Sequence, residues 1–86
     1  MKLQICVVRD RAIDQFGNPF FVTAIGQATR SFTDGVNSGK ADDLVAQHPD
    51  DFDLYHLGEY DAGTARFLLL DSPVVVVRGK DCVKTG

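Results

Sequence analysis

The sequence predicts an α+β domain in which one helix packs on one face of a small, mainly antiparallel sheet. Three observations predict this class: a strand-like alternation opens the chain, a single helical stripe follows it, and a hairpin pattern comes after the helix. Because strand, helix and hairpin are segregated in this order, the pattern is typical of α+β folds rather than of alternating βαβ units. The 86 residues are expected to form a single domain.

The first strand is expected over residues 3–8, where apolar side chains occupy every second position before a charged run ends the pattern. Residues 12–19 are interpreted as a surface connection, because they contain a Gly-Asn-Pro turn signal. The apolar triplet 20–22 is too short to assign by periodicity. We interpret it as an extended lead-in that packs on the core.

A helix is predicted over residues 24–37. Its apolar stripe recurs at steps of three and four residues and consists of Ile25, Ala28, Phe32 and Val36. Thr23 is the expected N-cap, and an Asn-Ser-Gly sequence supplies the stop. A short helical turn is expected at 41–47, where it must end before Pro49.

A β-hairpin is predicted over residues 52–70, with a Gly-containing turn at 61–64. Apolar side chains occur at both odd-numbered and even-numbered positions of its first strand, which indicates a strand that is mostly covered on both faces. The β-branched run 74–77 is predicted as a further strand. The tail, residues 79–86, is expected to be flexible.

Charge is unevenly distributed along the chain. The net charge of −3 divides into +2 over residues 1–40, −7 over residues 41–63 and +2 over residues 64–86. Proteins that coat nucleic acid through bulk charge are basic overall, so the acidic balance excludes that mode of binding. Folding could still bring the two basic ends together on one face, away from the acidic middle segment.

No pattern typical of an enzyme is present in the sequence. The serines lie in no GxSxG context, and no Gly-rich phosphate loop is flanked by a strand and a helix. We therefore expect neither catalytic activity nor a cofactor. Cys6 and Cys82 lack the clustered spacing of a zinc site and are expected to be free thiols. A signal peptide and a membrane-spanning stretch are not expected either.

An acidic cluster lies between residues 48 and 61 and consists of His48, Asp50, Asp51, Asp53, His56, Glu59 and Asp61. Strand alternation predicts that the odd-numbered carboxylates share one face, with His56 on the other. Two interpretations remain open. The cluster either solvates a strand edge and caps a turn, which the unspaced pattern favours, or it forms a metal or acid–base site.

Basic and aromatic residues provide a second candidate site, because proteins that bind single strands combine a basic groove with aromatic stacking surfaces. The candidates for nucleic-acid binding are Arg9, Arg11, Arg30, Arg66, Tyr55 and Tyr60. Phe20 is a further candidate for stacking. Most phenylalanines, Phe20, Phe21 and Phe67 among them, are expected in the core instead.

Two segments carry a family resemblance: Phe-Thr-Asp-Gly-Val-Asn at 32–37 and His-Pro-Asp-Asp-Phe-Asp-Leu-Tyr-His-Leu-Gly-Glu-Tyr-Asp at 48–61. Asn-Pro-Phe-Phe at 18–21 and Ala-Thr-Arg-Ser-Phe at 28–32 fit the same pattern. Over roughly residues 1–72 the chain resembles the small non-structural protein of gokushoviruses, microvirus-family bacteriophages with circular single-stranded DNA genomes. The resemblance implies a protein of the infected bacterial cytoplasm that is absent from the mature virion. It also implies a DNA-binding part in genome replication or in single-strand synthesis and packaging.

Two functions follow as hypotheses. The first is an accessory protein that binds single-stranded DNA, favoured by the resemblance and by the two basic ends. The second is a protein–protein adaptor that engages the viral replication initiator, the procapsid or a host factor, favoured by the acidic segment 41–63. A homodimer joined through strand edges or through the apolar run 74–77 is also expected, because a core this small is marginally stable.

Overall fold

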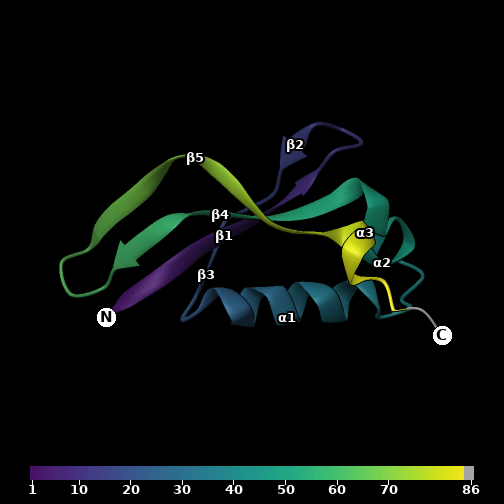
Figure 1. The fold of residues 1–86 in the computed structure, drawn as a ribbon, viewed down its shortest axis with the longest axis horizontal. Coiled ribbons are helices and arrows are strands. Elements are labelled where there is room, and N and C mark those ends of the chain that lie inside the picture. The colour runs from purple at the N-terminus through teal and green to yellow at the C-terminus, as the bar shows by residue number, and fades with distance from the viewer. Residues whose placement is uncertain (85–86) are drawn as a thin grey trace.

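The computed structural model describes residues 1–84 as a curled antiparallel sheet with one long helix lying along one face (Figure 1). The elements in chain order are β1 (Lys2–Asp10), β2 (Gln15–Phe16), β3 (Phe20–Val22), α1 (Ile25–Val36), α2 (Leu44–Gln47), the 3₁₀ turn η1 (Pro49–Asp51), β4 (Phe52–Asp61), β5 (Arg66–Arg78) and α3 (Gly79–Cys82). The α+β class predicted from the sequence is confirmed. Among the described residues, no helix is long and apolar enough to cross a membrane.

The sheet has the strand order β2-β1-β4-β5, and β3 also pairs with β1. Every pairing is antiparallel. The predicted first strand and the predicted hairpin 52–70 are both present. The run 74–77 is not a separate strand, however, because β5 continues past Pro73 to Arg78. A proline fits here because β5 is an edge strand, where a missing N–H breaks no ladder bond.

The predicted helix is confirmed as α1, and its apolar stripe faces the sheet. Ala28, Phe32 and Val36 are buried in one core cluster with Cys6 and Leu54 of the sheet. This burial supplies the stability of α1, since no side chain caps its first turn.

The N-cap of α1 is Ala24 rather than the predicted Thr23. Thr23 lies one residue too early to cap the helix. Its backbone N–H and its hydroxyl instead donate to Gln27 Oε1, at 3.1 and 3.0 Å. The side chain of Gln27 therefore reaches back from the first turn to fix the residue that precedes the cap.

The predicted turn at 41–47 is present as α2, which is shorter and begins at Leu44. Asp43 is its N-cap, and the carboxylate accepts a hydrogen bond from Val45 N–H at 3.0 Å. Pro49 then starts η1, where its fixed φ suits the first position of a helical turn.

Residues 79–84, which we expected to be flexible with the rest of the tail, instead contain α3 and pack on the domain. Asn37 holds this segment from both sides: its amide donates to Cys82 O at 2.8 Å, and its Oδ1 accepts from Lys84 N–H at 2.9 Å. Gly79 is required by close approach, because a Cβ there would lie 2.1 Å from Pro49 O. Residues 85–86 of the expected tail lie outside the described residues.

Candidate functional site

The sheet has two faces with different surroundings, and strand alternation assigns each side chain to one of them. Cys6 and Leu54 belong to the core cluster beneath α1, so their neighbours along β1 and β4 point to the opposite side. We call that opposite side the open face. The cross-strand register places on it Leu3, Ile5, Val7, Arg9, Phe16, Phe21, Asp53, Tyr55, Tyr60, Phe67, Leu69, Val75 and Arg78. Three of these, Ile5, Val7 and Asp53, are buried, so the exposed part of this face is formed by the other side chains.

Three aromatic rings form one group on the open face, towards the hairpin end of the sheet. Tyr60 lies with its ring centroid 5.0 Å from that of Phe67, and Phe21 lies 5.6 Å from Tyr60 in an edge-to-face arrangement. Phe21 and Phe67 are 44% and 57% exposed. Large apolar rings with this much exposure are available to a ligand, and we call the three the hairpin ring group.

A second ring pair lies further along the same face and consists of Phe16 and Tyr55, with centroids 5.3 Å apart. The guanidinium carbon of Arg9 lies 5.5 Å from the centroid of Phe16, within cation–π distance. Phe16 is 45% exposed. The pair, here called the arginine-side rings, therefore combines an exposed aromatic surface with a fixed cation.

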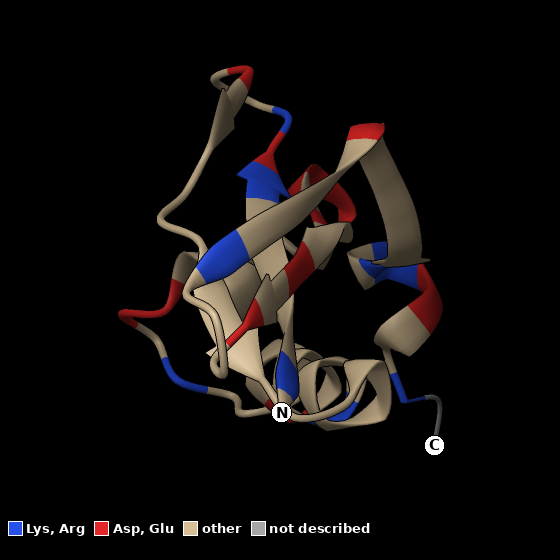
Figure 2. Ribbon diagram, turned by 90° about the vertical axis from the view of Figure 1, so that its left-hand side faces the viewer, with Lys and Arg blue, Asp and Glu red and all other residues tan. Residues whose placement is uncertain are grey.

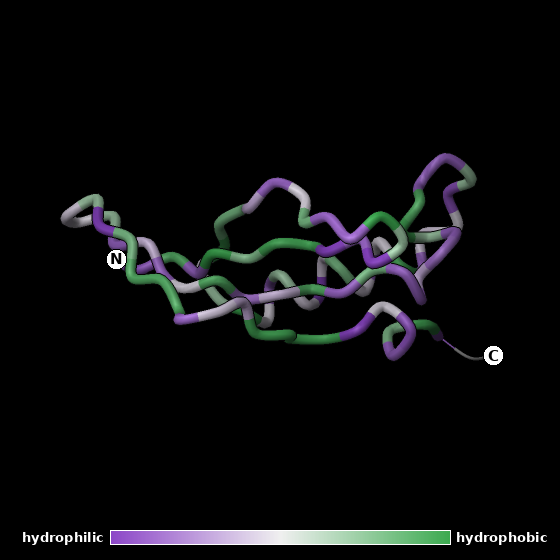
Figure 3. Tube along the Cα trace, turned by 90° about the horizontal axis from the view of Figure 1, so that it is seen from above, coloured by the Kyte–Doolittle hydropathy of each residue, from purple (hydrophilic) through white to green (hydrophobic). Residues whose placement is uncertain are grey.

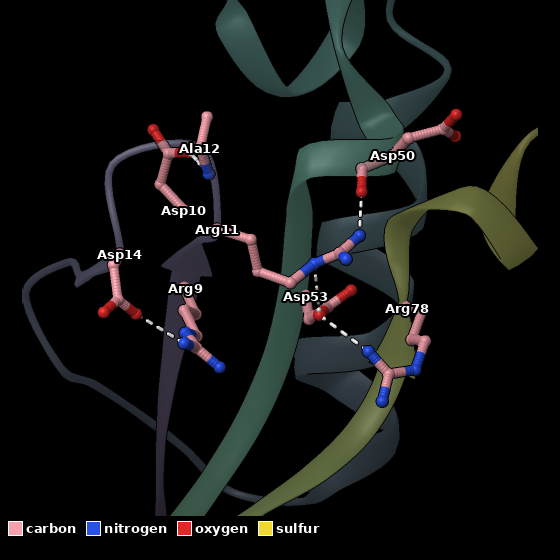
Figure 4. Close-up of polar contacts among 8 residues, drawn as sticks. All are labelled: Arg9, Asp10, Arg11, Ala12, Asp14, Asp50, Asp53 and Arg78. Atoms are coloured by element: carbon pink, nitrogen blue, oxygen red, sulfur yellow. Dashed lines mark hydrogen bonds and ion pairs between the residues drawn. The ribbon is translucent and has the colours of Figure 1, made fainter.

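Beyond these rings, a fully buried carboxylate joins two arginines (Figure 4). Arg11 Nε and Arg78 Nη1 both lie 3.0 Å from Asp53 Oδ2. The Oδ1 atom of Asp53 has no hydrogen-bond partner within residues 1–84. Two arginines thus share one carboxylate, and the carboxylates of Asp10 and Asp14 lie at the same end of the sheet (Figure 4).

Arg9 is fixed by a different carboxylate, that of Asp14 (Figure 4). Its hydrogen bond to Asp14 raises the pKa of the Arg9 guanidinium above its usual range, and Tyr55 adds to the shift. Arg9 is therefore a permanent cation, but one that is already paired.

The structure gathers four of the six predicted site residues at the open face: Arg9, Arg11, Tyr55 and Tyr60. It does not bring Arg30 there, because Arg30 is exposed on α1, on the other side of the sheet. Arg66 is paired with Asp61, one position from the Tyr60–Phe67 pair, so alternation directs it to the α1 side.

The two basic ends of the chain do not form a basic face apart from the acidic segment. β4 carries much of that segment and lies between β1 and β5 in the strand order. Figure 2 accordingly shows basic and acidic stretches interleaved across the sheet. The cross-strand row Arg9–Asp53–Arg78 is one instance.

Sequence reasoning missed three of the exposed rings. Phe21 and Phe67 were expected in the core, and Phe16 was not considered. Phe20 is partly buried and packs against the core cluster, as expected for most of the phenylalanines. Alternation within the triplet 20–22 could have separated Phe20 from Phe21, had the triplet been recognised as a strand.

The acidic cluster is divided by a bulge in β4. The register with β1 shifts between His56 and Gly58, leaving Leu57 unpaired and reversing the alternation beyond it. His56 and Glu59 consequently share a face, contrary to the prediction. Gln4 joins them: its Oε1 lies 2.9 Å from His56 Nε2, and its Nε2 donates to Glu59 Oε2 at 3.0 Å.

Metal binding finds no support from this arrangement. Within the part of the chain that the structure describes, the His, Cys, Asp and Glu side chains form no group of three or more that could hold an ion. Asp53, the buried member of the cluster, is occupied by two arginines.

Comparison with known proteins identifies a phage protein family. A family model described as "Phage ORF5 protein" matches residues 3–82. No curated protein and no solved structure matches the chain. The matched residues include α1, the open face and the strands of the sheet except for Lys2, the first residue of β1.

Proposed function

The chain belongs to the phage ORF5 protein family, and on that premise we propose that it is a bacteriophage accessory protein that binds single-stranded DNA through its open face. The observation that carries the proposal is the set of exposed rings on that face, in the hairpin ring group and the arginine-side rings. Unpaired bases stack on such rings with little regard to sequence, at about 1–3 kcal/mol for each base.

The spacing of the rings supports a ligand that is extended. Tyr60 is opposite Leu3 in β1 and Tyr55 is opposite Val7. At about 3.4 Å for each residue of an antiparallel strand, the two ring groups are about 14 Å apart along the sheet. A flexible single strand can span this distance and stack a base at each group, whereas bases inside a duplex are already stacked and paired.

Charge on the open face supports binding that depends weakly on salt. If each of the four arginines among the predicted site residues contacted a phosphate, the log–log salt slope would be near −3, at about −0.7 for each contact. Arg30 lies elsewhere, while Arg9, Arg11 and Arg78 share two carboxylates. One net positive charge remains, so we expect a slope of about −0.7.

The test is a fluorescence anisotropy titration with labelled oligo-dT of about 12 nucleotides, within the known range of site sizes, over a salt series. Phe21→Ala should weaken binding by about 5- to 150-fold, which corresponds to the loss of one stacking contact. Phe21→Tyr should restore binding, because it keeps the ring. Leu44→Ala, at a more exposed apolar site on α2, should bind as the wild type does.

Absence of oligonucleotide binding at low salt would refute the proposal. A steep salt slope together with normal binding by Phe21→Ala would also refute it, because charge rather than stacking would then hold the DNA. Thermal melts of each variant separate loss of binding from loss of the fold.

The resemblance supports a finer statement of the role. We propose a non-structural, non-catalytic gokushovirus protein that acts in the infected bacterial cytoplasm, in genome replication or in single-strand synthesis and packaging. Detection of the chain in purified virions would contradict this assignment.

A protein–protein adaptor is the second candidate, and one observation favours it. A cleft of about 310 Å³ lies beside η1, where Ile13, Leu44 and Phe52 provide apolar lining and Asp10 and Asp51 provide carboxylates. This chemistry suits an apolar side chain next to a basic one on a partner. Ile13→Lys should abolish partner binding under this function and leave oligonucleotide binding unchanged.

A further inference from the structure

The outer edge of the sheet at β5 is unusually apolar. β5 is the last strand in the order β2-β1-β4-β5, so within residues 1–84 no strand pairs with its outer side. The run Phe67–Leu70 is exposed along this edge, at 57%, 48%, 64% and 41% in chain order. Figure 3 shows β5 as two hydrophobic stretches separated by a short hydrophilic one.

This edge lacks the devices that usually keep edge strands apart. Soluble proteins protect edges with charges, prolines, bulges or covering loops. Here Pro73 and the irregular pairing around it protect the middle of β5, but the run Phe67–Leu70 contains neither a charge nor a proline. This edge therefore has unpaired backbone N–H and C=O groups next to exposed apolar side chains. Another β-strand can form hydrogen bonds with the backbone groups and cover the side chains.

We propose that β5 pairs with β5 of a second copy of this chain, extending the sheet across a two-fold axis. A fully exposed large side chain presents roughly 150–250 Å², so the four exposed fractions amount to about 400 Å² per chain. With backbone and flanking atoms, two copies bury about 1,000 Å², the lower bound for a specific interface. Because this area is at the lower bound, we expect a weak dimer that dissociates in the micromolar range.

Symmetry restricts how the two strands align. A two-fold axis that extends a sheet runs perpendicular to it, so each face of one copy continues into the same face of the other. Residues directly opposite each other must therefore be both odd-numbered or both even-numbered. Centring the axis on Leu68 places Phe67 opposite Leu69 of the second copy. It also places Leu70 opposite Arg66, whose aliphatic stem can cover an apolar side chain, as the short side chain of an aspartate cannot. Centring it on Leu69 would place Phe67 opposite Asp71. We therefore assign Leu68 to the axis.

The same symmetry has a consequence for the open face. Both open faces lie on the same side of the extended sheet, and the two copies of Phe67 lie near the axis, so the hairpin ring groups become neighbours. Any role of these neighbouring ring groups in DNA binding rests on the proposed function. Dimerisation itself does not rest on it, and dimerisation is measured without DNA.

Analytical ultracentrifugation of the full chain over about 10–500 µM tests the proposal. The wild type should approach twice the 9.4 kDa chain mass at the upper end. Leu69→Lys should remain a monomer, because it places a charge in the pairing edge at a site that is 64% exposed. Leu44→Lys is the matched control, since Leu44 is 62% exposed on α2, and it should dimerise normally.

Cross-linking tests the alignment. Leu68→Cys should form an intermolecular disulfide on mild oxidation, because opposed residues of antiparallel strands have Cα atoms about 4.5–5.5 Å apart, within disulfide range. Cys6 and Cys82 are buried, so the wild type should cross-link little. A wild type that stays monomeric throughout would overturn the proposal and leave a strand of a different protein as the occupant. Equal behaviour of the two lysine variants would also overturn it.

Discussion

Replacing Gly58 by alanine tests the bulge that organises β4. Gly58 is buried and has a φ of +149°, a conformation that side chains rarely adopt. A Cβ at this position would lie 2.4 Å from Leu68 O and 2.7 Å from Leu69 Cα. Both are backbone atoms of β5, so they cannot rotate aside as the end of a side chain can, and the strands must separate locally.

The expected cost has two parts. An unfavourable backbone conformation costs about 1–3 kcal/mol, and an atom forced into a packed site costs about 1–3 kcal/mol more. Gly58→Ala should therefore lower the free energy of unfolding by about 2–6 kcal/mol. Domains of this size have a total stability of about 4–13 kcal/mol, and each kcal/mol shifts Tm by about 4–8 °C. A fall in Tm of 10 °C or more is expected.

Urea denaturation followed by circular dichroism measures this effect. Gly35→Ala is the control, because a Cβ at this position in α1 meets nothing within 4 Å. It should stabilise the protein by up to about 1 kcal/mol through helix propensity alone. If Gly58→Ala is within about 0.5 kcal/mol of the wild type, the size of a harmless surface change, the reasoning from close backbone approach is refuted.

Three further predictions concern the core and the buried carboxylate. Phe32→Ala should lower the free energy of unfolding by about 3–5 kcal/mol, because the ring is 7% exposed beneath the sheet; a small shift in a thermal melt would mean that α1 packs elsewhere. Asp53→Ala should cost about 1–3 kcal/mol in urea denaturation, since Arg11 and Arg78 lose a shared partner but are exposed enough to be hydrated; an unchanged midpoint would contradict this. Burial raises the pKa of the Cys6 thiol, so the native state binds that proton more tightly and the free energy of unfolding should fall above about pH 8.5; an equal fall in Cys6→Ala would exclude this origin.

Much of the fold could be predicted because its signals are local. The spacing of Ala28, Phe32 and Val36 predicted both the helix and its buried side, since 3.6-residue periodicity needs no knowledge of the rest of the chain. The hairpin 52–70 followed from two strand-like runs around a turn. The tail could not be predicted in this way, because its order depends on Asn37, more than 40 residues away.

The candidate site was predictable only in part. Arg9, Arg11, Tyr55 and Tyr60 were identified by residue type and lie together at the open face. Arg30 was grouped with them by charge alone, and charge does not report on which side of a sheet a residue lies.

The first strand, the helix α1 with the stripe that it buries, and the hairpin all follow from the sequence alone, because periodicity is a property of neighbouring residues. The tertiary structure decided which rings are exposed, where the acidic strand lies, and which side chains share a face. One unpaired residue, Leu57, reverses the alternation in β4, and the position of β4 between two basic strands interleaves the charges. Both depend on pairing between residues far apart in the chain, which hydrogen bonds and packing select only when the whole sheet forms.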